Sequence, residues 1–319
     1  MRMKITFLGT SSGAPSRHRN ISSIALQLPQ KATLWLFDCG EGTQHQALRS
    51  TLRISQLERI FITHLHGDHI FGLLGLLASR SLQVGGVSPV TIYGPQGLSE
   101  YVRQSLHWSQ MRPGYPIEVR TITPGIVFED EDFTVRCTPV QHRIPAFAYS
   151  VTERDQQGRF DADKAQKMGI EPGPIYGTLK NGGTATLADG RVVSGADLTG
   201  PTRAGRKFVF SGDTTYCPNM VEIAQNADLL VHESTYLEED RALAERASHS
   251  TAMMAATVAK EAGAKRLILT HFSARYDADG GNRMADLLAE AQAVFPSAQL
   301  AHDFLTYEIP RSENERSNE

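Results

Sequence analysis

The fold is decided by the stretch Phe61-Ile62-Thr63-His64-Leu65-His66-Gly67-Asp68-His69-Ile70-Phe71-Gly72, in which four side chains able to bind a metal ion fall within six residues. These four are His64, His66, Asp68 and His69, in the pattern H-x-H-x-D-H. A largely apolar run at residues 59–62 precedes the motif and another at 70–78 follows it, which predicts a strand, a polar loop and a helix. Open α/β sheets place their chemistry in loops at the carboxyl ends of strands. Because Zn²⁺ binds imidazole nitrogen and carboxylate oxygen, the stretch predicts a metal site.

Six adjacent residues cannot surround a metal ion, so further ligands are expected downstream. His142, Asp213 and His271 each come shortly after an apolar run that is expected to form a strand. Any one of them alone would more often be a structural residue, but together the seven ligands contain no Cys and suit a two-metal centre. We expect one ion to be held by His64, His66 and His142, and the other by Asp68, His69 and His271. Asp213 is the expected bridge, because a carboxylate offers two oxygens.

Several residues are suited to the proton transfers and phosphate binding of phosphodiester hydrolysis. Asp68 is the expected general base. His249 is the best candidate for the acid, at a predicted helix N-terminus whose free N–H groups could also bind phosphate. Glu233 could orient His249, although plain helix capping explains both residues about equally well. Arg275 could clamp a phosphate; the alternative is an ordinary surface arginine.

The composition is that of a globular protein, with 40% hydrophobic and 21% charged residues over 319 residues. The net charge of −3 does not indicate a nucleic-acid binder, so a polyanionic partner would need a local basic patch. Three widely spaced cysteines indicate reduced thiols. The N-terminus is too polar for a signal peptide and the apolar runs are too short to span a bilayer, so a soluble cytoplasmic protein without a membrane partner is expected.

Strands and helices alternate along most of the chain, which predicts an α/β fold. Further strands are expected at residues 4–8, 22–28, 33–37, 89–93, 208–210, 228–232 and 267–270, and helices at 43–50, 97–108, 218–226, 251–262 and 283–294. Residues 117–122 and 126–138 have the composition of a β-meander.

Residues 152–207 differ from the rest of the chain. They contain ten glycines and nine Lys or Arg against seven Asp or Glu, a net charge of +2 that leaves −5 for the remainder. Such a segment is expected to be a protruding or mobile arm that is not part of the domain core, or a disordered insertion; the order of residues 169–177 favours a structured tip. The polar tail, residues 311–319, is expected to be disordered.

The H-x-H-x-D-H loop with the later His, Asp and His resembles the metallo-β-lactamase superfamily. This resemblance implies a four-layer αβ/βα sandwich with the metal ions at one edge. It does not identify the substrate, because lactonases, thioesterases and nucleases share the motif.

Other segments resemble the ribonuclease Z family, which cuts the 3′ trailer from precursor tRNA. They are residues 7–15, 38–44, the His-Glu-Ser-Thr and His-Ser-Thr segments at 232–235 and 249–251, and residues 269–276. Ser234 stands where the family more often has Ala, and Arg17 where Lys is common. The resemblance covers residues 3–308, fits the short form and implies one domain over residues 1–310, with the arm inserted.

The resemblance also implies functional assignments. Asp68 would be the base, and His249 would protonate the leaving ribose oxygen. Two Zn²⁺ ions per subunit, a homodimer, and products with a 3′-hydroxyl on the tRNA and a 5′-phosphate on the trailer are implied. The arm would grip the tRNA elbow, and the loop at residues 15–20 would sense the CCA end. The residues expected to contact tRNA are Arg17, Arg19, Gly173, Pro174, Lys180 and Arg275.

Two alternatives remain open from the sequence. One is a small-molecule hydrolase of the same fold, acting on a lactone, thioester or phosphodiester; the basic arm and loop argue against it. The other is a non-catalytic RNA-binding protein on a dead hydrolase fold, against which the intact set of seven ligands argues.

Overall fold

A computed structural model describes residues 2–84, 88–187, 189–277 and 281–311 of the chain. Its residues divide into two compact units, Met1–Thr152 with Arg206–Pro310, and Glu153–Gly205 with Arg311. The expected tail lies outside the described residues, apart from Arg311. Within the described part of the chain, no helix is long and apolar enough to cross a membrane.

The first sheet contains seven strands in the order β16-β1-β2-β3-β4-β5-β6. Their bounds are Lys4–Gly9 for β1, Ser23–Leu28 for β2, Thr33–Phe37 for β3, Leu57–Phe61 for β4, Val90–Gly94 for β5, Ile117–Thr121 for β6 and Thr306–Glu308 for β16. Strands β3 to β6 run parallel, whereas β16, β1, β2 and β3 pair antiparallel. The parallel half therefore presents the carboxyl ends of β3 and β4 at one edge.

The second sheet repeats this plan in the order β15-β14-β13-β12-β9-β8-β7. The bounds are Gly125–Glu129 for β7, Phe133–Val140 for β8, Ala146–Glu153 for β9, Lys207–Phe210 for β12, Leu229–Glu233 for β13, Leu267–Thr270 for β14 and Ala298–Leu300 for β15. Strands β12 to β15 are parallel, and β12 pairs antiparallel with β9. The single meander expected over residues 117–138 is wrong, because β6 joins β5 in the first sheet and only β7 and β8 pair with each other. Strand composition does not specify the pairing partner.

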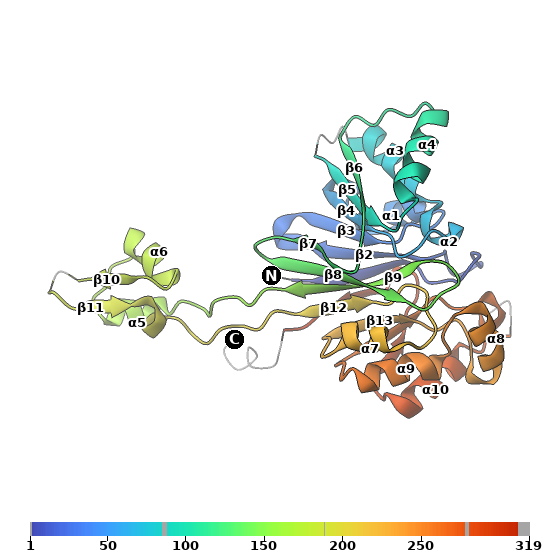
Figure 1. The fold of residues 1–319 in the computed structure, drawn as a ribbon. Helices are drawn as coiled ribbons and strands as arrows, with labels where there is room; N and C mark the ends of the chain where they lie inside the picture. The colour runs from blue at the N-terminus through green and yellow to red at the C-terminus, as the bar shows by residue number, and fades with distance from the viewer. Residues whose placement is uncertain (1, 85–87, 188, 278–280, 312–319) are drawn as a thin grey trace. The chain divides into compact units, whose positions relative to one another are not determined.

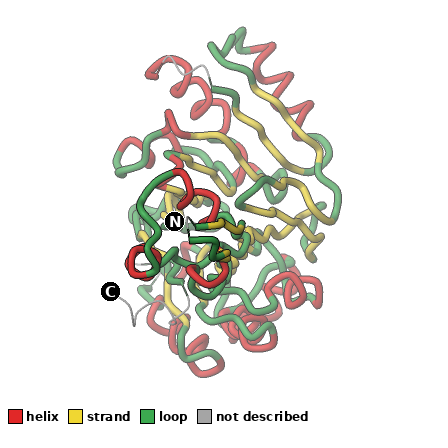
Figure 2. The backbone as a smooth tube through the Cα atoms, turned by 90° about the vertical axis from the view of Figure 1, so that its left-hand side faces the viewer, coloured by secondary structure: helices red, strands yellow, loops and turns green. Residues whose placement is uncertain are grey.

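Helices cover the outer face of each sheet, which confirms the expected four-layer αβ/βα sandwich (Figure 1). The helices of the first unit are α1 at Thr43–Leu48, α2 at Gly67–Ile70, α3 at Leu73–Val84, α4 at Leu98–Trp108, α7 at Pro218–Ala224, α8 at Arg241–Ala247, α9 at Ala252–Glu261 and α10 at Met284–Val294. Helices α1, α3 and α4 lie by the first sheet, and α7, α9 and α10 by the second. The side view in Figure 2 shows helices outside the strands on both sides.

The main core of the first unit lies between the two sheets. Aromatic side chains from both sheets meet there; for example, Phe37 stacks on Phe61 with ring centroids 5.1 Å apart and contacts Phe208 edge-on. Fully buried aromatic side chains of this kind contribute about 1.5–3 kcal/mol each by burial. A rigid sandwich of this kind gives the loops at its edge a fixed base.

The second unit has a small apolar core of its own. It contains α5 at Ala162–Lys167, α6 at Pro174–Lys180, β10 at Thr184–Thr186 and β11 at Val192–Ser194. Ile170, Leu179 and Val193 are buried together. Gly195 is required for this packing, because a Cβ there would lie 2.0 Å from the Leu179 carbonyl oxygen. That this unit is a tRNA-binding arm stays a prediction.

Candidate metal centre

The candidate site lies at the carboxyl ends of strands from both sheets. Residues 64–69 lie in the loop after β4 and at the start of α2, and His142, Asp213 and His271 come one to three residues after the ends of β8, β12 and β14. The structure brings all seven expected ligands together, in two groups of four that share Asp213. Within each group the potential ligand atoms lie within 4.8 Å of one another.

The first group consists of His64, His66, His142 and Asp213. His66 Nδ1 lies 3.0 Å from His64 Nε2 and 3.1 Å from His142 Nε2. Asp213 Oδ2 lies 3.6 Å from His64 Nε2. His142 Nδ1 lies 2.8 Å from the Ser248 carbonyl oxygen, to which it donates, and this leaves the lone pair on Nε2 facing the group.

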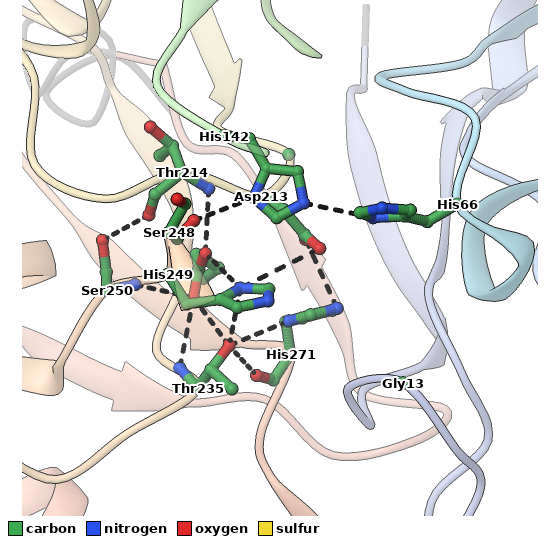
Figure 3. A network of polar contacts seen from close by, with 12 residues as sticks. Gly13, His66, His142, Asp213, Thr214, Thr235, Ser248, His249, Ser250 and His271 are labelled. Carbon is green, nitrogen blue, oxygen red and sulfur yellow. Dashed lines mark hydrogen bonds and ion pairs between the residues drawn. The ribbon is translucent and has the colours of Figure 1, made fainter. Parts of the chain in front are cut away.

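The second group consists of Asp68, His69, Asp213 and His271. His271 Nε2 lies 3.4 Å from Asp68 Oδ2 and 3.3 Å from Asp213 Oδ1. His69 Nε2 lies 3.5 Å from Asp68 Oδ2 and 3.3 Å from Asp213 Oδ2. His69 Nδ1 is 2.7 Å from Asp38 Oδ2, a carboxylate behind a histidine of the kind that orients metal ligands. Figure 3 shows His66, His142, Asp213 and His271 pointing toward one another.

Several buried side-chain atoms at the centre of the site lack hydrogen-bond partners, as is expected of atoms that bind cations. His69 Nε2, His271 Nε2 and Asp213 Oδ1 are buried and have no hydrogen-bond partner among the described residues. Leaving such atoms unsatisfied costs about 1–3 kcal/mol each. An oxygen and nitrogen donor set without sulfur suits Zn²⁺ and other first-row divalent ions, so the residues present fit metal ions.

The ionisation of these groups also suits metal binding. Burial alone would raise the pKa of Asp213, but the imidazoles of His271 and His69 outweigh it and lower that pKa well below its ordinary value. Burial lowers the pKa of His64 well below its usual value. For His69, burial is outweighed by the carboxylates of Asp213 and Asp38, and the pKa is raised well above its ordinary value. A bound cation would take the place of the proton on His69 Nε2, which faces Asp213, while Nδ1 keeps its contact with Asp38.

Backbone conformations at the edge are unusual for the residues that adopt them. Asp38 and His271 have φ values of 58° and 60°, in the left-handed region that non-glycine residues seldom occupy. Both residues directly follow a strand, β3 and β14 respectively. Such conformations gather at functional sites, where the surrounding structure holds them.

His249 and Glu233 form a buried pair beside the two groups. His249 Nδ1 lies 2.8 Å from Glu233 Oε1. The His249 ring stacks on His271 with centroids 5.4 Å apart, and both rings are labelled in Figure 3. Burial alone would lower the pKa of His249, but the Glu233 carboxylate outweighs it and raises the pKa to about 9. The protonated imidazole is therefore the stable form, as a general acid requires.

The helix N-terminus expected to bind phosphate at His249 is not available. Helix α9 begins at Ala252, and its N-cap Thr251 accepts a hydrogen bond from the Met254 N–H. The N–H groups of His249 and Ser250 donate to the Ala244 carbonyl and to Glu233 Oε2. These N–H groups already donate hydrogen bonds within the protein, so the expectation that they bind phosphate is wrong.

Comparisons with known proteins agree with this fold and site. Residues 33–169 and 178–272 match the model of the beta-lactamase superfamily domain. The ribonuclease Z of a Nostoc species is 57% identical over 309 residues, covering 97% of this chain and 96% of that protein, and that of Acaryochloris marina is 56% identical over 309 residues, covering 97% and 98%. The chain belongs to the ribonuclease Z family. The crystal structure of human short-form tRNase Z superposes with a TM-score of 0.71 at 32% identity and covers 97% of this chain and 100% of that one.

The arginines expected at the substrate in this ribonuclease Z family member differ in their surroundings. Arg275 is half exposed, lies over Tyr236 and pairs with Asp240 at 3.5 Å. Arg17 is exposed. Arg19 is largely buried and donates to Thr10 Oγ1 and the Ala301 carbonyl.

The three expected tRNA contacts in the second unit lie at one helix. Gly173 is the N-cap of α6, Pro174 is its first residue and Lys180 its last. All three are exposed, and the Lys180 ammonium lies 5.7 Å from the Phe160 ring centroid. Their contact with tRNA stays a prediction.

Sequence reasoning missed Asp38, Thr235 and Gly13 as parts of this site. Asp38 contacts His69, and it directly follows the strand 33–37, so the strand-end signal that found His271 applied to it as well. Thr235 Oγ1 donates to Glu233 Oε2 at 2.6 Å and lies 3.0 Å from His271 Nδ1. The Gly13 N–H donates to Asp68 Oδ2 at 2.8 Å. The last two contacts depend on tertiary structure and have no sequence signal.

Proposed function

We propose that this chain is a zinc-dependent endoribonuclease that removes the 3′ trailer from precursor tRNA. The products are a tRNA with a 3′-hydroxyl and a trailer with a 5′-phosphate. The observation that carries the proposal is the 57% identity to a ribonuclease Z over 309 residues. The seven metal-binding candidates and the His249–Glu233 pair support a hydrolytic reaction at phosphorus.

The test is incubation of the metal-loaded chain with a precursor tRNA that carries a 3′ trailer, followed by analysis of both new ends. We expect one cut that leaves a 3′-hydroxyl at the discriminator base. A chain that leaves precursor tRNA intact, yet hydrolyses a lactone or thioester, would identify the small-molecule hydrolase instead.

The proposed metal assignment follows the two groups. His64, His66 and His142 would hold one Zn²⁺ ion, Asp68, His69 and His271 the other, and Asp213 both. Two such ions would supply Lewis acidity at the phosphoryl oxygens and activate the attacking water.

The protein's own groups carry the proton transfers in this proposal. Asp68 accepts a proton from the attacking water, and His249 donates one to the leaving ribose oxygen. Glu233 accepts hydrogen bonds from the Thr214 N–H, Thr235 and Ser250, so it is held rigidly while it orients His249. Arg275 would approach the phosphate from the rim.

Removal of the metal ions is expected to abolish cleavage and to lower the melting temperature by several degrees. The bound ions satisfy buried polar atoms, and binding at 1,000 times Kd stabilises a fold by about 4 kcal/mol. The check is a thermal melt before and after chelation, with metal analysis expected to return two ions per chain. His64→Ala should lose most of the chelator-dependent shift, whereas a variant of the exposed His107, His107→Ala, should keep it. Equal melting temperatures with and without metal would contradict the assignment.

Replacement of Lys180 is expected to weaken precursor-tRNA binding. Lys180→Gln removes one exposed charge, and one lost phosphate contact reduces the slope of binding against salt by about one. Lys180→Arg should retain the slope, and hydrolysis of a small phosphodiester checks that the fold is intact. Point substitution is better than deletion of residues 169–182, because that deletion would remove the buried Ile170 and Leu179. An unchanged salt slope would remove Lys180 from the tRNA interface.

A homodimer in the cytoplasm completes the proposal. Leu48, Leu82 and Trp108 are exposed apolar residues on α1, α3 and α4, helices that neighbour one another. Such a surface suits a second copy of the chain. Trp108→Glu with Leu82→Glu is expected to yield a monomer in sedimentation experiments; a persistent dimer would place the interface elsewhere.

The free, buried cysteines favour a reducing compartment such as the cytoplasm.

A further inference from the structure

The loop from Thr10 to Asn20 contacts the candidate metal centre. The Gly13 N–H donates a 2.8 Å hydrogen bond to Asp68 Oδ2. The same oxygen faces His69 Nε2 at 3.5 Å and His271 Nε2 at 3.4 Å. The loop therefore holds the Asp68 oxygen that faces the second group of candidate ligands.

This hydrogen bond depends on an uncommon backbone conformation. Gly13 has a φ of 69°, in the left-handed region that glycine adopts without strain. A Cβ at Gly13 would meet nothing within 4 Å, so the constraint comes from the backbone and not from crowding. The N–H points at Asp68 only while the loop keeps this conformation.

The loop is also joined to the segment that carries His271. The Phe272 N–H donates to the Thr10 carbonyl at 2.9 Å, and the Ser12 N–H donates to the Phe272 carbonyl at 2.9 Å. His271 directly precedes Phe272, so one short loop contacts two candidate ligands of the same group. A shift of the loop would move Asp68 and His271 relative to each other.

Arg19 anchors this loop from within. Its Nη1 donates to Thr10 Oγ1 at 2.8 Å and to the Ala301 carbonyl at 2.9 Å. Its guanidinium lies 4.9 Å from the Phe272 ring centroid, and Nε lies 3.7 Å from Asp277 Oδ1. Only 11% of the Arg19 side chain is exposed, so little of it is accessible to RNA.

We propose that Arg19 is a positioning residue for Asp68. It fixes the loop against Phe272 and Ala301, and the loop in turn fixes the Asp68 carboxylate through the Gly13 N–H. This role differs from the tRNA contact that the family resemblance implies for Arg19. The inference rests on the proposed function for its account of Asp68, but its metal readout does not require RNA.

The test compares Arg19→Ala, Arg19→Lys and the control Arg112→Ala. Arg112 is exposed and makes no hydrogen bond or ion pair within the described part of the chain. Co²⁺ is titrated into the metal-depleted full chain and followed by absorbance. The kcat and KM are measured for precursor tRNA and for bis(p-nitrophenyl) phosphate.

We expect Arg19→Ala to weaken one of two Co²⁺ equivalents by about 10-fold or more, the effect typical of groups that orient ligands. The kcat should fall by similar factors for both substrates, while KM for precursor tRNA changes little. Arg19→Lys should recover part of the Co²⁺ affinity and part of kcat. The lysine ammonium can reach Asp277 but cannot also reach both the Thr10 hydroxyl and the Ala301 carbonyl. Arg112→Ala should behave as the unchanged chain.

A raised KM for precursor tRNA, with unchanged Co²⁺ affinity and unchanged hydrolysis of the small ester, would overturn the proposal and make Arg19 an RNA contact. If Arg19→Ala does not fold, Ser16→Ala replaces it, since Ser16 Oγ donates to Asp277 Oδ2 at 2.6 Å. Ser16→Ala is then expected to weaken Co²⁺ binding and lower kcat, by smaller factors than Arg19→Ala. If Ser16→Ala changes neither Co²⁺ affinity nor kcat, the positioning role is refuted. If the chain without substitutions binds Co²⁺ but does not cleave precursor tRNA, the proposed function is refuted and the positioning role of Arg19 is not.

Discussion

Asp68→Asn is expected to reduce kcat for precursor-tRNA cleavage by about 10³-fold, while the Kd for precursor tRNA stays near that of the unchanged chain. The substitution keeps the shape of the side chain but removes the carboxylate that accepts the proton from water, and general base catalysis contributes about 10²–10⁴-fold. Binding should persist because the tRNA contacts are expected elsewhere. Single-turnover cleavage and a direct binding assay separate the two quantities.

Metal content decides how an Asp68 effect is interpreted. Asp68 Oδ2 also faces His69 and His271, so a variant that loses an ion would be inactive for that reason alone. Retention of two ions with lost turnover supports the role as base. Glu131→Gln, at an exposed carboxylate, is the matched control. Unimpaired turnover of Asp68→Asn would remove Asp68 from the mechanism.

His249→Ala is expected to reduce kcat for precursor tRNA by about 10²–10⁴-fold, yet to affect bis(p-nitrophenyl) phosphate far less. The ribose oxygen of the tRNA must be protonated as it leaves, whereas p-nitrophenolate leaves without a proton. The Glu233 carboxylate, 2.8 Å from His249 Nδ1, keeps the imidazole charged for this step. The measurement is the fold-reduction of kcat for precursor tRNA divided by that for bis(p-nitrophenyl) phosphate.

Equal losses on both substrates would contradict the acid role and indicate that His249 supports the metal centre, since its ring stacks on His271. Glu233→Gln should show the same substrate dependence with a smaller loss, about 10–100-fold, because it acts through His249. Its melting temperature must be measured alongside, because Glu233 also accepts hydrogen bonds from Thr214 and Ser250.

Strand ends were the most informative signal in the sequence. The apolar runs before His142, Asp213 and His271 were enough to place these residues at one edge, because the carboxyl ends of parallel strands meet there. The same rule applies to Asp38, which directly follows β3 but was not identified as a site residue from the sequence. The meander over 117–138 failed as a prediction. The β-rich composition was identified, but each residue of β6 pairs with a β5 residue 27 positions upstream, and this pairing is not encoded locally.

The sequence by itself determined the alternation of strands and helices and the strand-end positions of the seven candidate ligands, because these follow from periodicity and residue type. The four-layer sandwich and the family came from the resemblance of its motifs to known families. Only the tertiary structure decided how these residues are held. Asp38 behind His69, Thr235 between Glu233 and His271, and Gly13 against Asp68 are contacts between segments far apart in the chain. The role of Arg19 changed for the same reason. Its position in a basic loop suggested RNA, whereas its burial against Phe272 directs its donors into the protein.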